Sequence, residues 1–199
     1  MRILCAWGRG DAEVLRAPLA SRFPRAHIHV WPDAPATVDY AIVWRPPANV
    51  FEHTRVTGAL FNYGAGVDGL VDLPTLPSGI PVFRLEDAGM AEQMAEYVLT
   101  AVLRAWRGFD VYALRQREAR WRREPQRARE DFRIGILGMG VLGRAVADTL
   151  RGHGFAVAGW SRTPRAHAGV TLFSGNDALP AFLARTEVLV CLLPLTPAT

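Results

Sequence analysis

Three glycines, Gly138, Gly140 and Gly143, form a G-x-G-x-x-G pattern between an apolar run and a helical one. In such a turn the first glycine permits a tight backbone, the second lets a pyrophosphate approach, and the third lets the helix pack on the strand. The free N–H groups at the start of that helix attract phosphate. The pattern favours a dinucleotide site, with a purely structural strand–helix turn as the alternative. Residues expected to contact the nucleotide are Gly138, Met139, Gly140, Val141, Leu142 and Gly143.

Cations stand where an acid is common, about 20 residues beyond this turn. An Asp or Glu there usually accepts hydrogen bonds from the adenosine ribose and would repel a 2′-phosphate. This sequence instead has Ser161, Arg162, Thr163 and Arg165. Arginine pairs well with phosphate oxygens and serine removes the repulsion, so we expect NADPH as the cofactor. The alternative is that these are solvated arginines in a protein whose 23 basic residues are all Arg.

The bulk composition is that of an ordinary globular protein. Half of the 199 residues are apolar, 21% are charged and the formal net charge is +4, with arginines interleaved with acids, so no nucleic-acid partner is required. Cys5 and Cys191 lie in apolar runs and are predicted to be buried and reduced. The N-terminus turns polar after seven residues and no apolar run could span a bilayer. We expect a cytoplasmic protein without a membrane partner.

The first half alternates strand-like runs with turns and one helix. Strands are expected at 2–7, 26–31, 40–44, within 56–70 and at 80–85, with a helix in 11–23 that Pro18 disturbs. From Ala91 onward, three- and four-residue spacing predicts a long amphipathic helix, carried by Met94, Val98, Val102, Trp106 and Phe109.

The second half begins with a polar arm, residues 115–133, which carries eight Arg, four acids and Trp121. Beyond it the pattern alternates again, with strands expected at 133–137, 155–160, 169–173 and 187–193 and helices at 141–152 and 177–185. Alternation of this kind predicts an α/β fold with two Rossmann- or flavodoxin-like parallel-sheet domains.

Several stretches together resemble one enzyme family. They are GAGVD (64–68), RLEDAGMAEQMAEYVL (84–99), DFRIGILGMGVLG (131–143), WSRT (160–163) and LLPLTPAT (192–199). In this order they resemble the D-isomer-specific 2-hydroxyacid dehydrogenases, most closely the glyoxylate/hydroxypyruvate reductase A branch. The resemblance implies a substrate domain at 1–88 and an NADP-binding Rossmann domain at 89–199, with a homodimerisation arm at 91–131. It also implies a truncated product, because the first domain lacks its returning C-terminal helix and the second stops after its fourth strand.

The resemblance assigns further site residues. Gly64, Ala65, Gly66 and Val67 match a loop whose backbone amides bind the substrate carboxylate, although a plain strand–helix turn would look similar. Trp44 lines the substrate cleft or is a core aromatic, and Trp121 reaches a neighbouring subunit's site or covers the arm. Met94 fits a core role better than a ligand contact. Leu193, Pro194 and Thr199 match positions that flank the cofactor, and Pro194 also ends the strand.

The catalytic groups of the family, an Arg, a Glu and a His, correspond to sequence beyond Thr199. The five histidines present (27, 29, 53, 153 and 167) show no recognisable carboxylate partner and no metal-ligand spacing. Two hypotheses follow. In the first, the chain represents an NADPH-dependent reductase of glyoxylate or hydroxypyruvate, itself inactive at this length. In the second, it is a non-catalytic NADP(H)-binding module.

Overall fold

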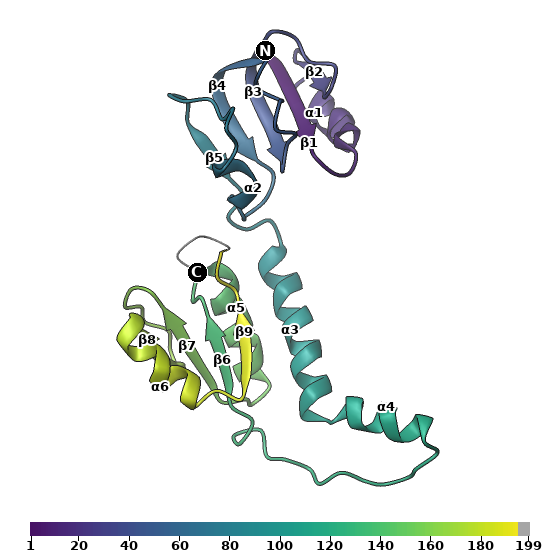
Figure 1. Ribbon diagram of the computed structural model, residues 1–199, viewed down its shortest axis with the longest axis vertical. Helices are drawn as coiled ribbons and strands as arrows, with labels where there is room; N and C mark the ends of the chain where they lie inside the picture. Colours follow the sequence, from purple (N-terminus) through teal and green to yellow (C-terminus); the bar gives the residue numbers. More distant parts are fainter. Residues whose placement is uncertain (195–199) are drawn as a thin grey trace. The chain divides into compact units, whose positions relative to one another are not determined.

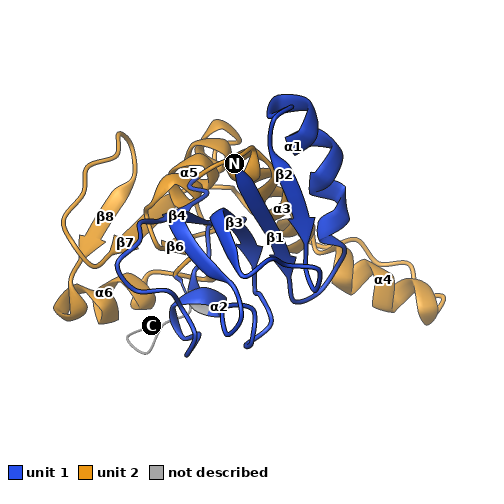
Figure 2. Cartoon of the chain, turned by 90° about the horizontal axis from the view of Figure 1, so that it is seen from above, with its two compact units in different colours: residues 1–86, 194–199 blue, residues 87–193 orange. Residues whose placement is uncertain are grey.

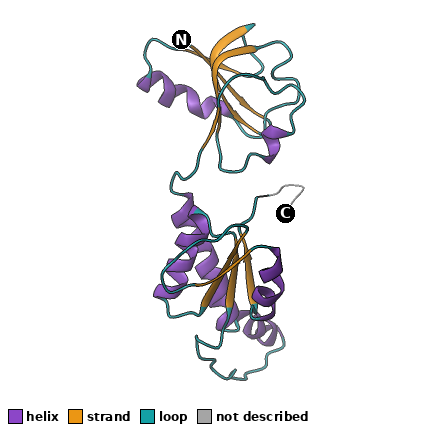
Figure 3. Cartoon of the chain, turned by 90° about the vertical axis from the view of Figure 1, so that its left-hand side faces the viewer, coloured by secondary structure: helices purple, strands orange, loops and turns teal. Residues whose placement is uncertain are grey.

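The computed structural model describes residues 1–194, apart from the side chain of Asp68. The chain divides into two compact units, one comprising Met1–Glu86 together with Pro194 and the other Asp87–Leu193 (Figure 2). Each unit is built around its own parallel sheet, with helices beside it (Figure 3). This arrangement confirms the expected α/β class with two parallel-sheet units. No helix in the described part is both long and apolar enough to cross a bilayer.

The sheet of the first unit has the strand order β2-β1-β3-β4-β5, which is the flavodoxin-like order. Its strands are β1 (Arg2–Trp7), β2 (His27–Val30), β3 (Thr37–Trp44), β4 (Arg55–Asn62) and β5 (Val82–Arg84). The connections include the 3-10 turn η1 (Ala12–Leu15) and the helices α1 (Arg16–Arg22) and α2 (Asp68–Val71). Pro18 lies in the first turn of α1, where a missing N–H is tolerated.

Alternate residues of these strands build two cores on opposite faces. Leu4, Val43 and Leu60 are fully buried in one cluster, whereas Ile3 and Cys5 belong to another. Because side chains alternate across a strand, both faces of β1 are apolar, as expected of a parallel sheet covered on both sides.

The second unit has the strand order β8-β7-β6-β9, the 3-2-1-4 order with which a Rossmann sheet begins. Its strands are β6 (Ile134–Leu137), β7 (Val157–Ser161), β8 (Thr171–Ser174) and β9 (Val188–Cys191). Its helices are α3 (Met90–Trp106), α4 (Phe109–Arg117), α5 (Val141–Gly152) and α6 (Leu179–Ala184), with the 3-10 turn η2 (Asn176–Ala178) before α6 (Figure 1).

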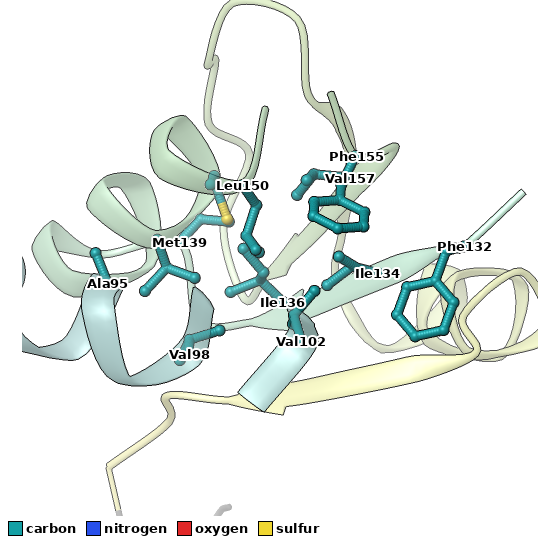
Figure 4. Packing of buried hydrophobic residues seen from close by; sticks show 12 residues of the cluster. Ala95, Val98, Val102, Phe132, Ile134, Ile136, Met139, Leu150, Phe155 and Val157 are labelled. Atoms are coloured by element: carbon teal, nitrogen blue, oxygen red, sulfur yellow. The ribbon is translucent and has the colours of Figure 1, made fainter. Parts of the chain in front are cut away.

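Two apolar clusters hold this unit together. Figure 4 shows the larger one, in which Val98 and Val102 of α3 pack with Ile134 and Ile136 of β6 and with Leu150 of α5. In the smaller cluster, the fully buried Phe182 of α6 packs with Trp160 and Ala158 of β7. The sheet is therefore held between α3 and α5 on one side and α6 on the other.

Two sequence expectations are wrong here. Helix α3 ends at Trp106, and Phe109 is 58% exposed because Gly108, at a φ of 65°, separates α3 from α4. Cys191 is exposed rather than buried, because β9 forms the edge of the four-stranded sheet in the described residues. Apolar periodicity does not reveal either an interrupting left-handed glycine or the place of a strand in its sheet.

Candidate nucleotide and anion sites

The glycine turn between β6 and α5 assigns a separate steric role to each glycine. Gly138 has a φ of +101°, which side chains rarely adopt. A β-carbon on Gly143 would lie 2.0 Å from the carbonyl oxygen of Gly138, so only glycine lets α5 pack this closely on the turn. A β-carbon on Gly140 would meet no protein atom within 4 Å. The open position is therefore the middle glycine, where a ligand could approach the backbone.

The amides of this turn are unpartnered donors. Within residues 1–194 the N–H groups of Met139 to Gly143 donate no hydrogen bond. The first helical hydrogen bond of α5 runs from the Arg144 N–H to the Gly140 carbonyl at 3.1 Å. Gly140 caps the 12-residue helix α5 without a side-chain partner. Free amides together with the helix dipole make this terminus suited to an anionic group.

The side chains in the turn face different surroundings. Met139 is 1% exposed and packs against Gly159 of β7, where an added β-carbon would come within 2.5 Å of the Met139 sulfur. Only the backbone of Met139 is therefore free to meet a ligand. Val141 is 49% exposed and Leu142 is half-buried, so their side chains can cover a bound molecule.

The corner after β7 is formed by Ser161 and an exposed loop. The Ser161 hydroxyl is buried and donates to the carbonyl of Thr163 at 2.7 Å, which closes the turn. Arg162, Thr163 and Arg165 are exposed. The guanidinium groups of the two arginines make no ion pair or hydrogen bond within the described residues, and 162–170 contains no acid. The corner is therefore cationic and uncompensated.

One histidine has a carboxylate partner that the sequence did not reveal. His167 Nε2 lies 2.7 Å from Asp148 Oδ1 of α5, and Arg151 Nη1 lies 3.7 Å from the same oxygen. Arg151 also packs against Gly169, which has a φ of +69°. These contacts join the loop after β7 to α5, so the expectation that no histidine pairs with a carboxylate is wrong.

The end of β9 supplies the last nucleotide-site candidates. Leu193 is half-buried, belongs to the cluster around Phe182, and its Cδ2 lies 3.3 Å from where a β-carbon on Gly138 would be. Pro194 is exposed. Thr199 lies outside the described residues.

A second set of free amides lies in the first unit, after β4. Within residues 1–194 the N–H groups of Gly64, Ala65, Gly66 and Val67 donate no hydrogen bond. Trp44, at the end of β3, is half-buried and lies over this loop, because a β-carbon on Gly64 would come within 1.9 Å of its ring. Trp44 and the loop lie at the carboxyl ends of β3 and β4, which are neighbouring parallel strands, and such sheets bind ligands at these ends.

Sequence reasoning missed two strand residues that hold this loop. Asn62 is 3% exposed, and its Nδ2 donates to the carbonyls of Gly64 and Gly66, each at 2.8 Å. Arg84 Nη1 donates to the carbonyl of Ala65 at 3.1 Å. A polar residue closing an otherwise apolar strand, directly before a glycine loop, was the available signal for Asn62.

A groove of about 570 Å³ lies near the amino ends of β3 and β4, away from the Gly64–Val67 loop. Thr54 and Arg55, at the start of β4, line it, and none of the predicted site residues does. The described residues also contain no cluster of three or more His, Cys, Asp or Glu side chains that could hold a metal ion. The free amides and the cationic corner therefore remain the chemically distinctive features.

Comparison with known proteins decides the family. The sequence model for the D-isomer specific 2-hydroxyacid dehydrogenase, NAD binding domain, matches residues 99–199. The chain belongs to this family. It is 44% identical over 195 residues to glyoxylate/hydroxypyruvate reductase A of Serratia proteamaculans and 45% identical to that of Yersinia enterocolitica. These alignments cover 95% of the chain and 62% of each relative, so the chain spans less than two thirds of their length.

Solved structures agree with this assignment. A D-isomer specific 2-hydroxyacid dehydrogenase from Xanthobacter autotrophicus Py2, in complex with NADPH and MES, matches all of the chain with a TM-score of 0.91 and 40% identity. An NADPH-dependent glyoxylate/hydroxypyruvate reductase from Sinorhizobium meliloti, with NADP and sulfate, matches with a TM-score of 0.90 and 34% identity. The chain covers 65% and 64% of these proteins.

Proposed function

We propose that this dehydrogenase-family chain is the cofactor- and substrate-binding part of an NADPH-dependent reductase of small 2-oxo acids, with glyoxylate and hydroxypyruvate as substrates. The nucleotide pyrophosphate binds the amides of Met139 to Gly143, and Arg162 and Arg165 bind the adenosine 2′-phosphate. When bound, the cofactor supplies the hydride. The chain's own residues hold it, orient it and cover it with Val141, Leu142, Leu193 and Pro194.

The observation that carries the cofactor proposal is the uncompensated charge after β7. Two exposed guanidinium groups stand there with no acid in the loop, and an acid at Ser161 would repel a 2′-phosphate. The relatives from Xanthobacter and Sinorhizobium, whose solved structures hold NADPH and NADP, support this preference.

Titration with NADPH and NADH tests the proposal. We expect Arg162→Ala and Arg165→Ala each to weaken NADPH binding by about tenfold, the loss of one charge-assisted hydrogen bond, and to leave NADH binding nearly unchanged. Arg133→Ala is the matched control, because it removes an exposed cation at the amino end of β6, away from the carboxyl ends of the strands where the cationic corner lies. Equal affinity of the unaltered protein for both cofactors would refute the phosphate pocket.

The substrate half of the proposal rests on the free amides of Gly64 to Val67, with Trp44 beside them. Amides that face an open surface suit a carboxylate. We propose that the 199-residue chain binds NADPH without reducing glyoxylate. Measuring NADPH oxidation with glyoxylate tests this, and turnover by the chain would contradict it. The same assay can be run on a longer chain that includes the downstream reading frame. If both chains bind NADPH without any turnover, the result favours a non-catalytic NADP(H)-binding module.

We also propose that the arm at residues 91–131 carries a homodimer interface. A groove of about 850 Å³ runs along it, lined by Phe109, Tyr112 and the 95% exposed Trp121 between arginines. Exposed aromatics with Arg are typical of interface cores. Light scattering should report a dimer that Trp121→Ala weakens, and a monomer at high concentration would refute the interface. The cytoplasmic location stays a prediction.

A further inference from the structure

The loop of free amides after β4 has an internal clamp. Three successive carbonyls of this loop, those of Gly64, Ala65 and Gly66, accept hydrogen bonds from side chains at the ends of β4 and β5. Asn62 ends β4 and Arg84 ends β5, and these two strands are paired in register at these residues. The clamp is therefore built by the sheet edge and not by the loop itself.

Because the peptide unit is planar, fixing the direction of one carbonyl also fixes the direction of the next residue's N–H group. In a planar trans peptide, the C=O of one residue and the N–H of the next point in opposite directions. Because the carbonyls of Gly64 and Gly66 both point at Asn62 Nδ2, the N–H groups of Ala65 and Val67 both point away from it. The carbonyl of Ala65 is likewise turned toward Arg84, which directs the Gly66 N–H away from that guanidinium.

Burial makes Asn62 the stiffer part of the clamp. Its side chain is 3% exposed, so releasing either hydrogen bond would leave a buried donor unsatisfied. Both neighbours are carbonyl oxygens, so the group that faces them must be the amide NH₂. Arg84 is exposed and holds the central carbonyl from the side of β5, bringing a positive charge to the loop.

We infer that Asn62 and Arg84 are positioning residues for a carboxylate site formed by the amides of Ala65, Gly66 and Val67. This inference rests on the proposed reduction of 2-oxo acids, since it names the groups that shape the substrate-binding loop. Neither side chain needs to touch the substrate. Asn62 presets the direction of two donors, so the anion meets a loop that needs no reorganisation. Arg84 adds attraction for an anionic ligand.

The test is a titration of the isotope-labelled protein with oxalate, a non-reducible dicarboxylate, followed by amide resonances. We expect the Ala65, Gly66 and Val67 signals to move. Asn62→Leu, which keeps the volume but removes both donors, should weaken oxalate binding by about tenfold. Arg84→Met, which keeps the apolar stem at an exposed position, should weaken it less. Thr57→Val is the matched control, since it removes a side-chain hydrogen bond from β4 to the Val38 carbonyl.

The outcomes separate the two proposals. If oxalate moves no loop amide, or if Asn62→Leu and Arg84→Met both bind oxalate as tightly as Thr57→Val does, the positioning role is overturned. If the amides move and depend on Asn62 while the extended protein reduces no 2-oxo acid, the anion site stands and the proposed reductase fails. Should Asn62→Leu not fold, Arg84→Met alone decides. Unchanged NADPH affinity in the variants should accompany the weakened oxalate binding.

Discussion

A β-carbon on Gly143 would lie 2.0 Å from the carbonyl oxygen of Gly138, a backbone atom that cannot swing aside. Gly143→Ala should therefore destabilise the second unit by about 1–3 kcal/mol, the usual cost of overpacking. Gly140→Ala has open space and an allowed φ of −80°, so it should fold normally. Its methyl group would instead occupy the place of the pyrophosphate and weaken NADPH binding by about tenfold or more. Thermal unfolding and cofactor titration of both variants measure the contrast, and a reversed pattern would contradict it.

The cationic corner makes a prediction about salt. Arg162 and Arg165 are exposed, so their attraction for a 2′-phosphate is screened as ionic strength rises. We expect the Kd for NADPH to rise with added NaCl more steeply than the Kd for NADH. In the double variant Arg162→Ala/Arg165→Ala, the salt dependence of the Kd for NADPH should approach that for NADH. Parallel slopes in the unaltered protein would mean that the two arginines do not meet the extra phosphate.

The two cysteines should differ in reactivity. Cys5 is fully buried, and burial raises the pKa of its thiol to about 11, so it stays protonated at neutral pH. Cys191 is exposed at the end of β9. Ellman's reagent should therefore modify one thiol in the native protein and two after denaturation. Cys191→Ser should abolish the native reaction, and a fast native reaction in that variant would show that the first unit opens readily.

Acid should weaken the junction between the arm and β9. Arg127 Nη2 donates to Glu187 Oε2 at 2.8 Å, and this hydrogen bond lowers the pKa of Glu187. Because the folded pKa lies below the unfolded value, the contribution is complete above about pH 4.3 and is lost as the pH falls through the folded pKa. Glu187→Gln should therefore have a slightly lower Tm at neutral pH and a smaller fall in Tm on acidification. The pair is partly exposed, so the difference should be small, and identical pH profiles would contradict the contribution.

The positions of the strands along the chain and the glycine turn could be predicted because each depends on local sequence. Short apolar runs mark β1, β4 and β6, and the spacing of Gly138, Gly140 and Gly143 marks the turn after β6. Gly108 was missed because the apolar spacing of α3 continues across it to Phe109. Only the left-handed backbone at that glycine separates the two helices.

Contacts between residues far apart in the chain could not be predicted from the sequence. Asp148 and His167 are 19 residues apart, and their pairing depends on how α5 packs beside β7. Met139 sits in a motif that suggests ligand contact, yet its side chain fills the space left by Gly159 on the next strand. Arg84 reaches Ala65 only because β5 pairs with β4. In each case the determining partner comes from another element.

The hydrogen bond from the Ser161 hydroxyl to the Thr163 carbonyl has a consequence for engineering the coenzyme preference. An aspartate at 161 cannot donate that bond, and its charge would face the carbonyl that the hydroxyl now satisfies. Introducing the acid alone to shift the preference toward NADH would therefore remove the hydrogen bond that closes the turn after β7. The workable route is to neutralise the arginines first and redesign the backbone bend together with the acid.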